Sequence, residues 1–222
     1  MVPDGMGLAS VTAARIFKNG PSGQGLHLET LSTIGYQRTH SANRATTDSA
    51  AAASAWASGE KFRNGEISCH DDNRDGKCEP TPVSTILELA RERGKSAGLV
   101  ATSTVTHASP AAFGAHVPNR KCENEIARQY IQVTGVEVIL GGGATKFNAT
   151  EANVDDCGTF GDFIKAARMR GYDVAYTKEA MEKAASRRTK KLLGLFAPNG
   201  KTPELFRVFP QKHYRVDEPT LP

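Results

Sequence analysis

Long apolar runs are missing from this sequence of 222 residues. No stretch approaches the roughly 18 apolar residues that a membrane-spanning helix needs, so we expect no transmembrane segment in this chain. No strong charge imbalance is present either, since 28 basic residues stand against 24 acidic ones and the formal net charge is +4. The one dense basic cluster, residues 186–191, has no interleaved aromatic residue, which favours a solvated surface over a nucleic-acid site. We therefore predict no nucleic-acid partner.

Cysteine is scarce, and its four copies form no CxxC pair, which argues against a zinc ribbon and a thioredoxin-type site. An even number favours two disulfides in an exported protein, and four buried free thiols are the alternative. Because local loops close most easily, we predict that Cys69 pairs with Cys78 and Cys122 with Cys157. Met1 is followed at once by Val2-Pro3-Asp4 and not by a signal peptide. A periplasmic or extracellular location therefore implies an export signal that this sequence does not contain.

Strand-like and helix-like segments alternate along the chain. Short apolar or β-branched segments predict strands at 98–102, 136–140, 172–176 and 192–196, and helices are predicted from Thr81-Pro82 to Gly94 and over 123–133, 160–170 and 178–185. Repeated β-α-β units predict an α/β fold of the doubly wound class, with a mostly parallel sheet and helices on both faces. The absence of internal repeats and low-complexity linkers predicts a single domain over 1–222.

Both ends of the chain look unusual for such a fold. Asp4-Gly5-Met6-Gly7 is the kind of turn that follows a first strand, yet only three residues precede it. The segment 217–222 resembles the start of a helix with no helix after it. We therefore expect a partial domain, without its first strand and its carboxyl-terminal half.

A polar turn leads into an alanine-rich helix at 46–56 and places Ser49 in the first helical turn. Free backbone N–H groups and the positive end of the helix dipole favour an anion there. A serine hydroxyl at this point could attack phosphorus if a metal ion lowered its pKa. The alternative is that Asp48 or Ser49 simply caps the helix, a common arrangement. The segment is not the GxSxG elbow of acyl hydrolases.

Three further segments offer polar groups that could take part in a site, two of them where strands end. Asp4 follows the would-be first strand, where a carboxylate suits a hard cation, although an ordinary Asp-Gly turn is the alternative. His107 and Ser109 follow the strand that begins at Gly98, and in an extended segment they would point to the same side. Arg120 offers a guanidinium fork able to hold two phosphate oxygens.

Taken together, these segments resemble the alkaline phosphatase family. The resemblance covers essentially the whole chain in family order, and it is most specific around Ser49 and His107; its blocks are Val2-Pro3-Asp4-Gly5-Met6-Gly7, Thr47-Asp48-Ser49-Ala50-Ala51, Thr106-His107-Ala108-Ser109-Pro110-Ala111-Ala112, His116-Val117-Pro118-Asn119-Arg120, Leu140-Gly141-Gly142-Gly143 and Leu192-Leu193-Gly194-Leu195-Phe196.

The resemblance implies a metal-dependent phosphomonoesterase that acts on small phosphate monoesters through a phosphoserine. Ser49 would be the nucleophile, with one zinc ion lowering its pKa. Asp4 would bridge that zinc and a magnesium ion, Ser109 would bind the magnesium, and His107 would shape the magnesium shell. Arg120 would hold two phosphate oxygens, with Asp48 helping to orient it. The family also suggests a homodimer for the complete protein.

The remaining metal ligands of the family have no counterpart here. Beyond Arg120 the sequence has one histidine, His213, and no matching ligand block, so the second zinc site has no visible ligands. We therefore expect the 222-residue chain by itself to be inactive. The competing hypothesis is a non-catalytic binding or structural protein that keeps the first half of the fold.

Two other motifs bear on ligands. Asp71, Asn73 and Asp75, followed by Gly76, match the start of a calcium-binding loop, but Pro82 stands where the bidentate glutamate belongs. A polar surface loop closed by Cys69 and Cys78 is the favoured interpretation, with calcium as the alternative. The contiguous glycines 141–143 lack the spacing of a P-loop, which excludes that kind of nucleotide site.

Overall fold

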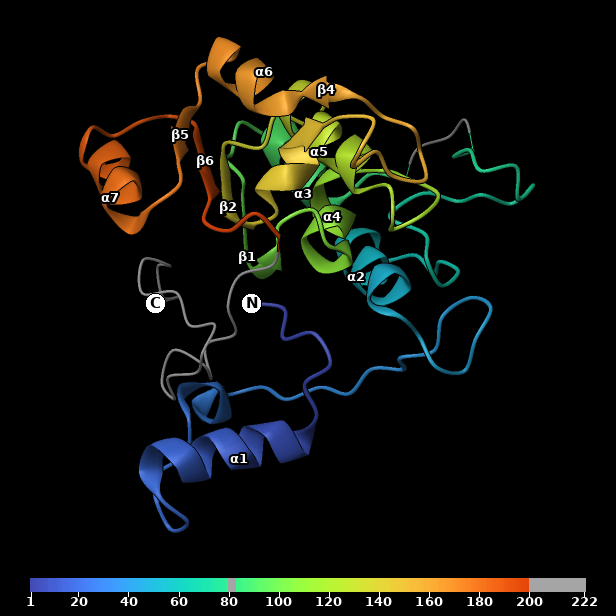
Figure 1. The fold of residues 1–222 in the computed structure, drawn as a ribbon. Helices are drawn as coiled ribbons and strands as arrows, with labels where there is room; N and C mark the ends of the chain where they lie inside the picture. The colour runs from blue at the N-terminus through green and yellow to red at the C-terminus, as the bar shows by residue number, and fades with distance from the viewer. Residues whose placement is uncertain (80–82, 200–222) are drawn as a thin grey trace.

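A parallel β-sheet lies at the centre of the computed structural model, which describes residues 1–79 and 83–199. Its four strands lie in the order β1 (Gly98–Thr104), β2 (Val138–Gly142), β6 (Leu192–Leu195) and β5 (Asp173–Ala175). The first residues of the four strands are paired in one row, so all four strands run from the same edge of the sheet. Their carboxyl ends therefore share the opposite edge, where β1 ends beside the N terminus of the chain (Figure 1).

Helices cover both faces of this sheet. Ile139, Leu193 and Leu195 are buried in one cluster with α4 (Ala108–Gly114), α5 (Glu123–Gln132) and α6 (Phe163–Met169). Leu192, with the partly buried Leu140, faces the other way and packs with α7 (Lys178–Ser186). Alternate strand residues thus serve opposite faces, as the pleat of a sheet requires. The predicted α/β class with a parallel sheet flanked by helices is confirmed.

Side-chain caps set where several helices begin. Asp162 accepts a hydrogen bond from Lys165 N at the start of α6, and Thr177 accepts one from Ala180 N at the start of α7. The helix predicted from Thr81-Pro82 instead begins at Ile86, as α3 (Ile86–Glu92), because Thr85 and Glu88 form a reciprocal capping box. Thr81 and Pro82 lie outside the described residues.

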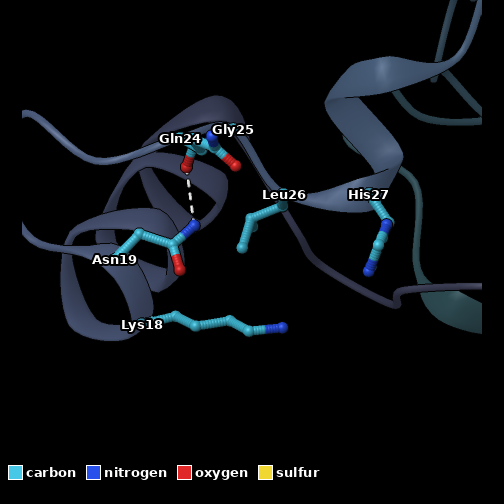
Figure 2. Close-up of a pocket in the computed structure, with 6 residues that line it drawn as sticks. All are labelled: Lys18, Asn19, Gln24, Gly25, Leu26 and His27. Carbon is cyan, nitrogen blue, oxygen red and sulfur yellow. Dashed lines mark hydrogen bonds between the residues drawn. The ribbon is translucent and has the colours of Figure 1, made fainter.

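An N-terminal arm was not predicted from the sequence. It contains the helix α1 (Leu8–Asn19) and the 3-10 turn η1 (His27–Thr30), joined by an ion pair between Arg15 and Glu29. None of the α1 residues is buried, and the arm lies apart from the sheet in Figure 1. A hollow of about 340 Å³ lies between the two elements, where Asn19 donates a hydrogen bond to the Gln24 carbonyl (Figure 2). None of the predicted site residues lines it.

The remaining elements pack around the helices that cover the sheet. Helix α2 (Ser49–Ser58) packs against α4 through alanines, and the short strands β3 (Asn148–Ala149) and β4 (Gly161–Asp162) pair next to η2 (Ala144–Phe147). Cys69 is bonded to Cys78 and Cys122 to Cys157, with Cα atoms 5.3 and 5.2 Å apart, so both predicted disulfides are confirmed. Among residues 1–79 and 83–199, no helix has the length and apolar character needed to cross a membrane.

Candidate active site

Ser49 is the first residue of α2, and Asp48 is its N-cap. The Asp48 Oδ1 atom accepts a hydrogen bond from Ala51 N at 3.0 Å, so the cap belongs to Asp48 and the Ser49 side chain is not used for it. Helix α2 is held in place because Ala50, Ala53 and Ala57 are buried. The half-buried Ser49 therefore stands at the positive end of a fixed helix, as an attacking hydroxyl near an anion requires.

Arg120 lies between two of the predicted residues. Its Nη1 atom donates to Asp48 Oδ2 at 3.1 Å, and its Nη2 atom lies 3.2 Å from His107 Nε2. A guanidinium can only donate, so His107 Nε2 is the acceptor in this contact. The two partners fix the plane of the guanidinium, and about a quarter of the Arg120 side chain remains exposed (26%). A planar fork held next to the start of α2 is suited to bind an oxyanion.

We expected His107 and Ser109 to lie in an extended segment, but they lie at the start of a helix. His107 is the N-cap of α4, and Ser109 is already inside the helix. The Ser109 hydroxyl donates to Asp4 Oδ2 at 2.8 Å, which joins two residues that are 105 positions apart in the chain. The start of α4 therefore contacts both Arg120, through His107, and Asp4, through Ser109.

A turn that sequence reasoning missed completes this arrangement. The backbone of Gly65 donates to Asp48 Oδ2 at 3.1 Å and accepts from Arg120 N at 2.7 Å. Asn64 Oδ1 accepts from Asp48 N at 3.2 Å. The only signal in the sequence is the Asn-Gly pair itself, which indicates a turn without indicating its partners.

Asp4, His107 and Ser109 line a cleft of about 1040 Å³ that runs along the exposed edge and face of β1. Carboxylate and hydroxyl oxygens are ligands that a hard cation such as magnesium prefers. Within the described part of the chain, no three His, Cys, Asp or Glu side chains are placed to hold a metal ion together. Asp4 and Ser109 thus fit part of a metal shell. His213 lies outside the described residues.

The loop with the calcium-like motif already satisfies its first carboxylate. Asp71 Oδ1 accepts from Asp75 N at 3.0 Å and Asp71 Oδ2 from Gly76 N at 3.1 Å, while Asn73 donates to Glu79. Together with the Cys69–Cys78 disulfide, these bonds close the loop on itself. This geometry favours the polar surface loop.

Known proteins resemble this chain in sequence and in structure. The alkaline phosphatase family model matches residues 1–220, so the chain belongs to the alkaline phosphatase family. It is 37% identical to the streptomycin-6-phosphate phosphatase of Streptomyces griseus and 36% identical to alkaline phosphatase 4 of Bacillus subtilis, over 89% and 90% of this chain. The structure of alkaline phosphatase from the Antarctic bacterium TAB5 superposes on 91% of the chain with a TM-score of 0.75 and 29% identity. A TAB5 variant with the same TM-score is described with Mg bound in its M3 site.

The chain spans about half the length of these relatives or less. It covers 46% of the Streptomyces protein, 41% of the Bacillus protein and 53% of the TAB5 chain.

Proposed function

We propose that the protein carrying this chain hydrolyses phosphate monoesters, with Ser49 as the nucleophile and a phosphoserine as the intermediate. The observation that carries the proposal is the placement of Arg120, held by Asp48 and His107 beside the N-terminus of the helix that begins at Ser49. Family membership and the name of the Streptomyces relative, a streptomycin-6-phosphate phosphatase, support the same reaction.

Each residue would have a separate role in the transfer of the phosphoryl group. Arg120 binds two non-bridging oxygens of the phosphoryl group, and Asp48 with His107 keeps its guanidinium in plane. The Ser49 oxygen attacks phosphorus and forms the serine–phosphate bond as the bond to the alcohol oxygen breaks. Water then cleaves the phosphoserine and releases phosphate. The first N–H groups of α2 stabilise negative charge near the reacting group.

Magnesium and zinc are part of the proposal. Asp4 and Ser109 would hold magnesium, and Asp4 and Ser49 would contribute to a zinc site, with His107 close to the magnesium shell. The metal ions would supply positive charge that makes the Ser49 hydroxyl easier to deprotonate. Hydrogen bonding between Asp4 and Ser109 and the Mg-bound TAB5 variant support this assignment.

We also propose that the protein is exported to the periplasm or the extracellular space. All four cysteines are in disulfides, and disulfides persist in oxidising compartments.

The test is a trapping experiment on the intact protein with Ser49→Ala. The variant is expected to form no acid-stable phosphoserine and to lose at least about 1000-fold in turnover of a chromogenic phosphomonoester. Ser58→Ala, at the other end of the same helix, is the matched control and should behave like the wild type. A Ser49→Ala protein that still forms the labelled intermediate would contradict the proposal.

A further inference from the structure

A tight turn at Arg63–Glu66 lies beside the candidate active site. Its ends are joined by two hydrogen bonds, from Glu66 N to the Arg63 carbonyl at 3.1 Å and from Arg63 N to Glu66 Oε2 at 2.7 Å. Glu66 is buried, with 4% of its surface exposed, and Gly65 has a φ of +97°, which favours glycine. The turn is therefore anchored at its base, and its tip, Asn64 and Gly65, faces the site.

The Asn64 side chain holds the segment that leads into Ser49. Its Oδ1 atom accepts from Asp48 N at 3.2 Å, and its Nδ2 atom donates to the Thr46 carbonyl at 3.1 Å. The Asn64 amide thus bonds the backbone carbonyl before Thr47 and the backbone N–H after it. Both bonds lie within three residues of the nucleophile, and they fix the backbone that sets where α2 begins.

The neighbouring residue of the same turn holds the arginine. The Gly65 carbonyl accepts from Arg120 N, and Gly65 N donates to the Asp48 oxygen that also binds the Arg120 guanidinium. The main chain at Gly65 therefore positions Arg120, whereas the side chain at Asn64 positions the approach to Ser49.

We propose that Asn64 is a positioning residue that aligns the Ser49 hydroxyl with a phosphoryl group bound by Arg120. The inference rests on the proposed phosphatase function. In-line attack depends on the distance and angle between the attacking oxygen and phosphorus, and a displacement of about 1 Å can cost on the order of 100-fold in rate. The Asn64 side chain bonds the backbone of Thr46 and Asp48, and through that backbone it would set the position of Ser49.

A structural role has to be separated from a positioning role, and the chain offers a matched residue. Asn153 also braces a loop through its amide, because it accepts from Thr150 N and donates to the carbonyls of Thr145 and Asn148. The partners of its side-chain hydrogen bonds, Thr145, Asn148 and Thr150, are not among the proposed site residues. Asn153→Ala therefore removes a comparable set of bonds without touching the path to Ser49.

The experiment compares the intact wild type with Asn64→Ala, Asn64→Asp and Asn153→Ala. We measure the single-turnover rate of phosphoserine formation, the inhibition constant of inorganic phosphate, and the melting temperature. Asn64→Ala is expected to slow phosphoserine formation about tenfold while the phosphate inhibition constant changes less than about twofold, because the Gly65 main chain still holds Arg120. Asn64→Asp keeps the acceptor for Asp48 N and should fall between the wild type and Asn64→Ala. Asn153→Ala should react at the wild-type rate.

Several results would overturn the inference. One is a rate for Asn64→Ala within twofold of the wild type. Another is an equal loss of rate in Asn153→Ala, and a third is a loss of phosphate affinity that parallels the loss of rate. If Asn64→Ala does not fold, the test rests on Asn64→Asp, and phosphoserine formation at the wild-type rate in that variant rejects the positioning role of Asn64. A failure of the proposed function is distinguishable, because the wild type would then form no phosphoserine at all.

Discussion

Asp48 uses its two carboxylate oxygens for two different tasks. Oδ1 caps α2 through Ala51 N, and Oδ2 accepts from both Gly65 N and Arg120 Nη1. The helix that carries the nucleophile and the arginine that would bind phosphate are therefore fixed by one side chain. The sequence left two interpretations of this segment open, a helix cap and a catalytic serine. They are compatible, because Asp48 caps the helix and leaves the Ser49 side chain for the proposed reaction.

This division predicts a selective effect of Asp48→Asn. Asparagine caps helices as well as aspartate does, so α2 should keep its cap. The amide NH₂ that replaces Oδ2 cannot accept from Arg120, and the guanidinium loses its orientation. We expect the inhibition constant of inorganic phosphate to rise about tenfold. Competitive inhibition measurements on the intact protein provide the check, with Asp162→Asn, at the cap of α6, as the control. Unchanged phosphate inhibition in Asp48→Asn would contradict the role of Asp48.

The candidate site shows the limit of what residue patterns predict. Asp48 and Arg120 are 72 positions apart, and Asp4 and Ser109 are 105 apart, so no local spacing indicates that they meet. The resemblance to the family identified these residues, and the structure joins them in pairs, Asp48 with Arg120 and Asp4 with Ser109. Asn64 and Gly65 were missed because their contacts are made to or from the main chain, which every residue possesses.

At the level of elements, α2 and α4 pack through small side chains. Ala50 and Ala53 on α2 are buried, as are Ala108, Ala111 and Ala112 on α4. Alanines let the two helices approach closely, and this contact places Ser49 near the start of α4. Any larger side chain in the contact has to push the helices apart, because protein interiors are close-packed.

Ala53→Leu is therefore predicted to weaken both stability and catalysis. Overpacking costs about 1–3 kcal/mol of unfolding free energy, and the displaced helix carries Ser49 away from Arg120. Ala55→Leu, on the half-buried side of the same helix, should cost much less. Chemical denaturation and steady-state kinetics on the two variants make the comparison. Equal effects in both variants would show that the contact with α4 does not decide the outcome.

A second link between elements joins the start of α3 to the segment after α4. His116 Nε2 lies 2.8 Å from Glu88 Oε1, and His116 Nδ1 lies 2.6 Å from the Ser68 carbonyl. Burial acts to lower the pKa of His116, but the bonds to Glu88 and Ser68 outweigh it and the pKa is raised. Burial likewise acts to raise the pKa of Glu88, but the bonds from His116 and Thr85 leave it lowered.

The signs of these shifts define a pH window for stability. The His116 contribution is complete below its ordinary pKa of 6.5 and is lost as the pH rises through the raised value in the folded state. The Glu88 contribution is present above the ordinary value of 4.5 and is lost as the pH falls through its lowered pKa. As the pH rises from 6 to 9, we therefore expect the wild type to lose more stability than His116→Gln, because only the wild type loses the contribution of a protonated His116. Melting curves across this range test the prediction, with His27→Gln on the exposed arm as the control. Parallel curves for the wild type and His116→Gln would refute it.

The elements were predictable to different degrees for physical reasons. Short apolar or β-branched runs identified all four strands of the central sheet, and the signal has its clearest physical basis in β6, where all four residues are buried. Helix α4 was missed because His107 and Ser109 were considered as part of an extended segment after the strand. Pro110 is compatible with the helix, since a proline in the first helical turn removes only an N–H that has no partner. Helix α1 follows Gly7, which makes no side-chain cap, and its exposed surface shows none of the burial that an apolar stripe indicates.

At the scale of the whole molecule, the two disulfides close two connections of the chain that lie near candidate-site residues in the sequence. Cys122, at the start of α5 and two residues after Arg120, is bonded to Cys157 before α6. Cys69–Cys78 closes the loop that follows the Asn64–Gly65 turn. Each disulfide thus fixes a connection close to a segment of the candidate site.

The lengths of the two closed loops predict how much each disulfide contributes to stability. Cys122 and Cys157 are separated by 35 residues and Cys69 and Cys78 by 9. In the chain-entropy model, the longer loop stabilises by about 4 kcal/mol and the shorter by about 2.5 kcal/mol. Replacing both cysteines of a pair with serine should therefore lower the melting temperature more for the pair Cys122 and Cys157 than for the pair Cys69 and Cys78.

Because Cys122 is also close to Arg120 in the sequence, the variant without Cys122 and Cys157 should bind inorganic phosphate more weakly, whereas the variant without Cys69 and Cys78 should keep its affinity. Calorimetry and phosphate inhibition on the two double variants test both statements, and a larger loss of stability in the Cys69 and Cys78 variant would show that native-state contacts, rather than loop length, set the contribution.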